Sequence, residues 1–186
     1  MFKRITRFIN AKKQRRNIAI KLHDALIEQS LQRWFFDVLG VKDTLTGRFD
    51  LVVLHAHLVF ERLDRDKDHT GNIAQQLFDI LFKQFDIALR EEGVGDMSVG
   101  KHIKAMAQGF YGRAQNYSSA FEQSDDRVLW EALKRNLALD TPEEEALMHV
   151  SAYLRRYRAI LADAPGGNFS QGRLPRLLVH EPGGEL

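Results

Sequence analysis

The sequence predicts an all-α protein, and two observations support this fold class. The 186-residue chain contains four prolines, and none of them lies in the first 141 residues. Because proline breaks the interior of a helix, this stretch can be helical almost throughout. Apolar residues recur at intervals of three and four, as on one face of a helix, rather than at every second position as in a strand. We therefore expect a single compact domain of about six helices.

The first three predicted helices each end at a stop signal. A helix over residues 16–39 is followed by Gly40, and a second begins near Phe49 and closes in the charged run 64–68. A third, over residues 71–92, is followed by glycines, the residue type that most often terminates a helix. Apolar side chains cover more than half of the circumference of this third helix, so we expect it to be the central helix.

Three further helices are predicted from capping signals. Ser98 can cap a fourth helix and Ser124 a short fifth one, because a serine side chain accepts hydrogen bonds from the free N–H groups of the first turn. Thr141, Pro142 and Glu144 have the spacing of a capping box with proline in the first helical position. A sixth helix should follow them.

Charge divides the chain into unequal parts. Residues 1–22 contain eight Lys or Arg and no acid, so the net charge of +2 conceals a segment of +8 and a remainder of −6. We treat 1–22 as a basic N-terminal segment, 23–163 as the helical domain, and 164–186, rich in glycine and proline, as an irregular tail. The basic segment suits contact with an anionic membrane or with the ribosome. Its contact residues would be Lys3, Arg4, Arg7, Lys12, Lys13, Arg15 and Arg16.

The sequence excludes several kinds of chemistry. It contains no cysteine, which rules out disulfides, thiolate metal sites and a cysteine nucleophile. A run that starts at Asp66 resembles an EF-hand loop, but Leu77 stands where the loop needs a bidentate Glu. Gly95 to Lys101 has the spacing of a phosphate-binding loop, but His102 follows where Ser or Thr is needed. We therefore expect no metal site and no cofactor.

Two histidines, His55 and His57, lie in the second helix. Residues two apart on a helix point in different directions, so they are not expected to share a metal ion. For His55 we favour a packed histidine over one that faces a haem group.

Four polar residues form a stripe along the third predicted helix. Its members lie within about 60° of one another at 3.6 residues per turn. Because the helix is apolar over most of its surface, we interpret the stripe as a partly buried structural seam in which Asp86 and Arg90 are partners. The seam residues are Gln75, Asp79, Asp86 and Arg90.

The fourth helix contains two glycines, Gly109 and Gly112, which each cost about 1 kcal/mol relative to alanine. Two interpretations account for them. A neighbouring element approaches the backbone closely within the core, or the glycines flank a groove that binds another protein. Aromatic residues and arginine are typical of such binding surfaces. The candidate binding residues are Phe110, Tyr111, Arg113 and Tyr117.

Several short motifs occur in order between residues 49 and 121. They are Phe49-Asp50-Leu51 leading to Leu54-His55, Gln75-Gln76-Leu77-Phe78-Asp79, Leu89-Arg90-Glu91-Glu92-Gly93-Val94-Gly95-Asp96, Lys104-Ala105-Met106-Ala107, and Phe110-Tyr111-Gly112-Arg113 ending at Tyr117. Taken together, they resemble the ubiquinol-cytochrome c chaperone family. The length of the chain is more similar to that of a bacterial member than to that of a mitochondrial one.

The resemblance implies an assembly factor rather than an enzyme. Members of the family look after newly made cytochrome b, the haem-binding membrane subunit of the ubiquinol-cytochrome c reductase (the bc1 complex), before it joins that complex. The implied partner is therefore nascent or newly inserted cytochrome b, bound at the candidate residues of the fourth helix. A small partner subunit, known from mitochondrial members, and the oligomeric state stay open.

The implied location is cytoplasmic and peripheral at the inner membrane, or the mitochondrial matrix if the source is eukaryotic. There the basic N-terminal segment would hold the protein near the membrane or the ribosome. The same charge supports an alternative from another functional class, namely a helical nucleic-acid- or ribosome-binding protein that acts through this segment.

Overall fold

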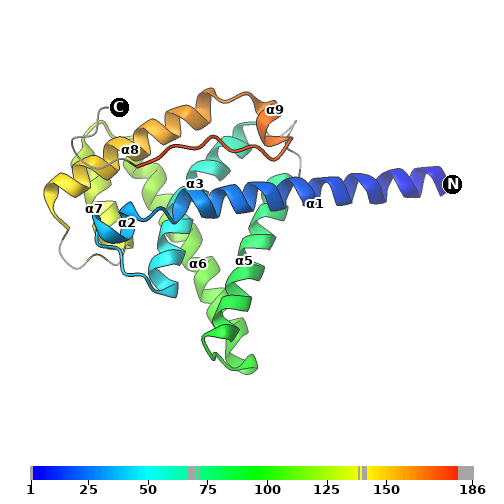
Figure 1. Cartoon of the computed structure of the whole chain (residues 1–186), viewed down its shortest axis with the longest axis horizontal. Coiled ribbons are helices and arrows are strands. Elements are labelled where there is room, and N and C mark those ends of the chain that lie inside the picture. The colour runs from blue at the N-terminus through cyan, green and yellow to red at the C-terminus, as the bar shows by residue number, and fades with distance from the viewer. Residues whose placement is uncertain (1, 67–69, 71, 138, 140–141, 180–186) are drawn as a thin grey trace.

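The computed structural model describes residues 2–66, 70, 72–137, 139 and 142–179, with side chains from residue 11 onward. These residues form six long helices and two short ones, and no β-sheet (Figure 1). An isolated antiparallel bridge joins Val41 to Leu139. The all-α fold class is thus confirmed. The helices are α1 (Phe2–Ser30), α2 (Trp34–Asp37), α3 (Leu45–Arg65), α5 (Ile73–Glu91), α6 (Asp96–Phe121), α7 (Asp126–Asn136), α8 (Glu144–Asp163) and α9 (Gly166–Phe169).

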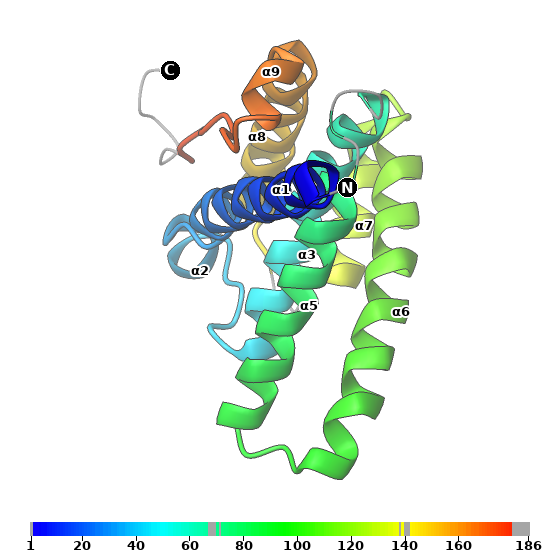
Figure 2. The same cartoon turned by 90° about the vertical axis from the view of Figure 1, so that its right-hand side faces the viewer.

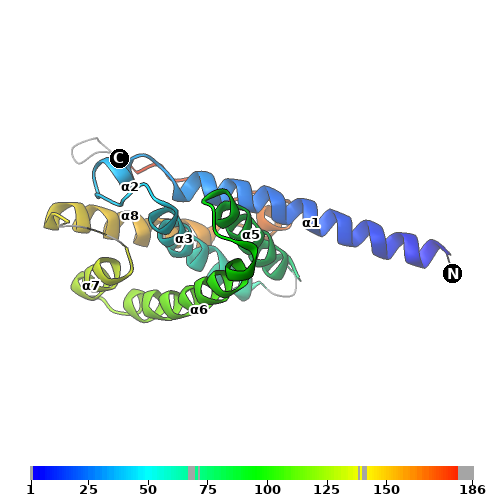
Figure 3. The same ribbon diagram turned by 90° about the horizontal axis from the view of Figure 1, so that it is seen from below.

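The central helix is α3, and not α5 as predicted. Every residue of α3 from Phe49 to Val59 is buried, and the helix packs against α1, α5, α6 and α8 (Figure 3). The run from Leu51 to Phe60 contains no polar residue except two histidines, and a helix that is apolar all round can be stable only inside a core. In contrast, α5 buries one face and exposes the other.

The first helix starts earlier and ends earlier than the predicted range of 16–39. It begins at Phe2, and after Ser30 the chain breaks before the short α2. The Ser30 hydroxyl donates to the Leu26 carbonyl at 2.6 Å, the local bond by which serine competes with helix continuation. The break allows Trp34 and Phe35 to turn back into the core, where both are buried.

The N-terminal half of α1 projects beyond the rest of the molecule (Figures 1 and 3). Among the described side chains of α1, Ala19 is the first that is buried. Lys12, Lys13 and Arg16 are exposed and Arg15 is half-buried. The remaining predicted contact residues, Lys3, Arg4 and Arg7, lie on the same helix, but their side chains are outside the described ones.

Two helices begin at different residues from those predicted. Gly95, in extended conformation, precedes α6, and Ser98 lies inside the first turn, where its hydroxyl donates to the Gly95 carbonyl at 2.9 Å. The cap of α7 is Asp125 instead of Ser124. Its carboxylate accepts a hydrogen bond from the Arg127 N–H at 2.9 Å, and a charged acceptor also interacts favourably with the helix dipole.

The sixth predicted helix, α8, begins two residues later than the capping box implied. Its first residue is Glu144, and Glu143 occupies the cap position without a side-chain cap bond. Pro142 therefore precedes the helix and does not occupy its first position. The proposed cap, Thr141, lies outside the described residues.

The end of the chain returns along α1 as an extended segment, residues 173–179, which we call the C-terminal strap (Figure 1). Two glutamines, Gln29 of α1 and Gln32 just after that helix, hold its backbone. The Gln29 amide donates to the Leu177 carbonyl at 2.6 Å and accepts from the Leu177 N–H at 3.1 Å. Gln32 donates to the same carbonyl at 3.0 Å and accepts from the Val179 N–H at 3.0 Å. The two side-chain amides therefore pair with the strap as a neighbouring strand would.

We expect Gln29→Ala to lower the free energy of unfolding by about 2–3 kcal/mol, because Gln29 is buried and also donates to the Tyr153 hydroxyl at 2.6 Å. Gln32→Ala is the matched control, and we expect it to cost about 1 kcal/mol, since Gln32 is half-buried and water can replace it. Urea unfolding measures both values. Equal losses for the two variants would contradict this assignment.

Candidate functional site

The four candidate binding residues of α6 do not share one surface. Phe110 and Tyr117 lie in the core, and Tyr117 is completely buried. Only Tyr111 is well exposed, at 62%. Arg113 is partly exposed but is engaged in an ion pair inside the protein. The expected groove flanked by all four residues is thus corrected to a surface at Tyr111 with aromatic support beneath it.

Arg113 explains one of the two glycines in α6. Its Nη2 lies 2.9 Å from Oδ1 of Asp50, a buried carboxylate of α3, and its guanidinium carbon lies 5.5 Å from the centre of the Phe49 ring. A Cβ atom at Gly109 would lie only 2.7 Å from Nη1 of Arg113, whereas a Cβ at Gly112 would meet nothing within 4 Å. A close approach thus accounts for Gly109, but the group that approaches is the Arg113 side chain of the same helix and not the neighbouring element that we expected. Nothing in the structure explains Gly112.

An aromatic cluster joins α5 and α6 beneath Tyr111. Phe78 stacks on Phe82, with ring centres 4.4 Å apart, and on Tyr111, with centres 5.8 Å apart. Phe110 meets Phe78 and Phe60 edge-on at 5.5 and 5.8 Å. Phe60 and Phe78 are half-buried, so the cluster opens to solvent around Tyr111. Rigid aromatic rings offer a large apolar contact area at low entropic cost, which suits a protein-binding surface.

The polar stripe of α5 faces solvent, and this corrects the expected partly buried seam. Gln75 donates to Asp79 at 2.8 Å, and Arg90 donates to Asp86 at 2.7 Å. Arg90 also pairs with Asp96 across the turn that leads into α6. Gln75, Asp79 and Arg90 are exposed. The residues pair along their own helix, as the i,i+4 spacing indicated, but they do not join α5 to the core.

His55 is a packed core histidine. Its Nδ1 lies 2.8 Å from the Leu51 carbonyl and therefore donates, which leaves Nε2 to accept from the Tyr153 hydroxyl at 3.0 Å. Burial lowers its pKa to about 4. Both nitrogens are satisfied within the protein, so the structure supports the packed interpretation over a haem-facing one.

His57 points to a different neighbour. Its ring stacks with Phe121, with centres 6.3 Å apart, and lies 6.2 Å from the ring of Tyr117. Its Nε2 is buried and has no hydrogen-bond partner among the described residues. Burial lowers its pKa to about 4. In the described part of the chain, no three His, Asp or Glu residues are placed to hold a metal ion, and Asp68 and Gly71 of the EF-hand-like run lie outside that part.

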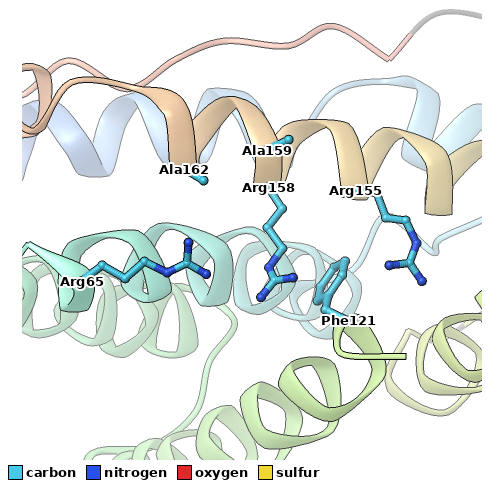
Figure 4. Close-up of a pocket in the computed structure, with 6 residues that line it drawn as sticks. All are labelled: Arg65, Phe121, Arg155, Arg158, Ala159 and Ala162. Carbon is cyan, nitrogen blue, oxygen red and sulfur yellow. The ribbon is translucent and has the colours of Figure 1, made fainter. Parts of the chain in front are cut away.

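A pocket of about 230 Å³ lies between α3, α8 and the end of α6 (Figure 4). Glu61 accepts two hydrogen bonds from Arg158, at 2.8 and 2.6 Å, and also pairs with Arg65. Arg155 donates to Asp126 at 2.6 Å. Acidic partners thus balance the positive charge, and these arginines mainly hold α8 against α3 and α7. The pocket is lined by Arg65, Phe121, Arg155, Arg158, Ala159 and Ala162.

No pattern in the sequence points to this pocket. Arg155 and Arg158 lie close together in the sequence, but Glu61, the carboxylate between Arg65 and Arg158, is 97 residues away from Arg158. Burial raises the pKa of Glu61, but the hydrogen bonds and charge of Arg158 outweigh burial and hold it below its usual value.

Comparison with known proteins identifies the family. The sequence model of a family described as "Ubiquinol-cytochrome C chaperone" matches residues 37–177, which include α3 to α9 and most of the strap. The chain belongs to the ubiquinol-cytochrome c chaperone family. The family match begins after α1, so the basic segment of this family member lies outside the matched range.

A solved structure extends the likeness to almost the whole chain. The crystal structure of the Cbp3 homolog from Brucella abortus matches this chaperone-family member with a TM-score of 0.82 and 28% sequence identity. The match covers 96% of this chain and 98% of that one. No curated protein matches the chain significantly.

The two glycines of α6 provide a matched pair of variants. We expect Gly112→Ala to raise the free energy of unfolding by about 1 kcal/mol, because the added methyl group meets nothing and alanine is the better helix former. Gly109→Ala should instead lower it, since the methyl group displaces Arg113 from the buried Asp50. Urea unfolding tests both, and a gain of similar size for the two variants would refute the role of Gly109.

Among the described residues, three buried groups contribute to the pH dependence of stability between pH 6 and pH 5. The pKa of both His55 and His57 is lowered to about 4, so acidification protonates them in the unfolded chain first and reduces stability. Burial raises the pKa of Asp50 to about 6, against the opposing charge of Arg113. On acidification Asp50 is therefore protonated in the folded chain before it is protonated in the unfolded chain, and this stabilising effect offsets the destabilising effect of one histidine. In this pH range the unfolded chain thus binds about one proton more than the folded chain. The free energy of unfolding therefore falls by about 1.4 kcal/mol for each pH unit of acidification.

We expect His57→Phe to make stability nearly independent of pH in this window, because the uptake at His55 and at Asp50 then cancels. Phenylalanine keeps the ring contact with Phe121. Urea unfolding at half-unit pH steps from 6.5 to 5 measures the slope. An unchanged slope would show that His57 is already protonated in the folded protein or is not buried.

Proposed function

We propose that this protein is an assembly chaperone that binds newly made cytochrome b and supports assembly of the ubiquinol-cytochrome c reductase. The family match over residues 37–177 carries this proposal. The likeness to the Cbp3 homolog from Brucella abortus, over nearly the full length of both chains, supports it. An exposed aromatic surface on a rigid helical body is also what a chaperone for apolar segments needs.

The client surface that we propose is the open edge of the aromatic cluster around Tyr111. Tyr111 is the exposed member, and the half-buried Phe78 stacks beneath it. Phe110 supports both rings from the core side. Arg113 and Tyr117, predicted as direct contacts, act indirectly in this proposal, because the first is held by Asp50 and the second is buried.

The location that we propose is the cytoplasmic face of an inner membrane. None of the helices in the described ranges combines the length and the apolar character that a membrane span requires. The projecting half of α1, with its exposed Lys12, Lys13 and Arg16, would provide the contact with the membrane. The same basic projection favours the second candidate role, contact with ribosomal RNA.

The test is affinity capture from solubilised membranes, followed by identification of the bound membrane subunits. We expect the wild-type chain to capture cytochrome b and Tyr111→Glu to capture at least about tenfold less, since a charge desolvated in an apolar contact costs 1.4 kcal/mol or more. Met148→Glu on α8 is the matched control, because Met148 is similarly exposed, at 56%, but lies outside the aromatic cluster. Its capture should equal that of the wild type.

A strain that lacks the chain provides the second measurement. We expect its level of cytochrome b to fall, because unassembled subunits are degraded. The proposal fails if cytochrome b is absent from the captured material and its level is normal in the strain that lacks the chain.

A further inference from the structure

A second pocket, also of about 230 Å³, lies between α1 and α5. The two helices pack against each other where the N-terminal half of α1 leaves the body of the molecule (Figures 1 and 2). The pocket therefore adjoins the projecting basic helix. We call it the α1–α5 groove. It is lined by Lys12 and Arg16 of α1 and by Gln76, Asp79, Ile80 and Lys83 of α5.

The cations of this groove are free, in contrast to those of the arginine pocket. Among the described residues, no acidic side chain lies within ion-pair distance of Lys12, Arg16 or Lys83. The carboxylate of the groove, Asp79, accepts a hydrogen bond from Gln75. Three positive charges, two of them from the basic segment, thus face one negative charge. This excess of positive charge favours the binding of an anionic ligand.

The groove also has apolar and acceptor groups that a simple anion would not use. Ile80 lies in its lining, and Ile87, which is 38% exposed, lies on the same face of α5 two turns further along. The Oε1 atom of Gln76 is buried and has no hydrogen-bond donor among the described residues. A ligand that fills the groove would therefore carry a negative charge, an apolar part and a hydrogen-bond donor.

We propose that the α1–α5 groove binds the headgroup of an anionic glycerophospholipid. The phosphate would lie among Lys12, Arg16 and Lys83, and a headgroup hydroxyl would donate to Gln76. The acyl chains would follow Ile80 toward Ile87. This inference rests on the membrane location proposed above and deepens it, because it gives α5 a specific share in the contact. RNA fits the groove less well, since no aromatic side chain lines it for base stacking.

Vesicle flotation with the purified full-length chain tests the proposal. We expect binding to phosphatidylcholine vesicles that contain phosphatidylglycerol, and little binding to phosphatidylcholine alone. Lys83→Glu should weaken binding by at least about fivefold, the effect of one basic residue at an anionic surface. Lys134→Glu on α7 changes the net charge equally, at an exposed site far from the projecting end of α1 (Figure 3), and should bind as the wild type does. Equal effects of the two variants would overturn the groove in favour of general charge attraction.

A comparison of two anionic lipids tests whether Gln76 recognises the headgroup hydroxyl. Phosphatidylmethanol carries the same charge as phosphatidylglycerol but has no headgroup hydroxyl. We expect the wild type to prefer phosphatidylglycerol and Gln76→Leu to bind both lipids alike. A wild type without preference would overturn the role of Gln76.

Competition distinguishes the sources of the bound phosphate. Inorganic phosphate or a short RNA, at constant ionic strength, should not displace the vesicles. Displacement by phosphate in the low millimolar range, or RNA binding with the same dependence on Lys83, would overturn the lipid assignment. Because the vesicles contain no protein, failure here leaves the capture of cytochrome b as a separate result.

Discussion

The burial of α3 on every side is the constraint on which the rest of the structure depends. Polar side chains on a helix enclosed in this way are stabilised by partners from other elements, since a buried group without a partner costs about 1–3 kcal/mol. Nε2 of His57, which has no hydrogen-bond partner among the described residues, is an exception. Each polar residue of α3 that is satisfied by another element therefore selects the register of that element. The pairs are Asp50 with Arg113 of α6, His55 with Tyr153 of α8, Glu61 with Arg158 of α8, and Arg62 with the carbonyls of Leu161 and Ala164 at the end of α8.

One of these pairs, His55 with Tyr153, is linked to a residue of α1. The Tyr153 hydroxyl that donates to His55 accepts from Gln29, and Gln29 in turn holds the strap at Leu177. The C-terminal end of α1 is thereby bound on two sides. No described side chain of α1 before Ala19 is buried, so the helix projects from the core beyond the part that packs against α3 and α5. The exposed position of the basic segment is thus a consequence of packing around α3.

The fold class and the family could be predicted from the sequence, but the central helix and the burial of the candidate binding residues could not, for physical reasons. A search for one apolar face selects α5, whereas a helix buried on all sides has no such face; the signal was the nearly unbroken apolar run from Leu51 to Phe60. The break after Ser30 depends on where Trp34 and Phe35 pack, which local propensity does not reveal. Phe110 and Tyr111 are neighbours in sequence, and only the positions of α3 and α5 decide that one is buried and the other exposed.

The two proposed surfaces share α5 without competing for it. Successive residues of a helix are about 100° apart, so Gln76, Ile80, Lys83 and Ile87 lie on the side of α5 opposite to Phe78 and Phe82. The first side borders the α1–α5 groove, and the second stacks with Tyr111 and Phe110 of α6. A lipid in the groove would therefore leave the aromatic cluster uncovered. With the pairs of α3 holding both neighbours of α5 in place, one rigid helix can rest on a membrane with one side while the other side supports a client segment.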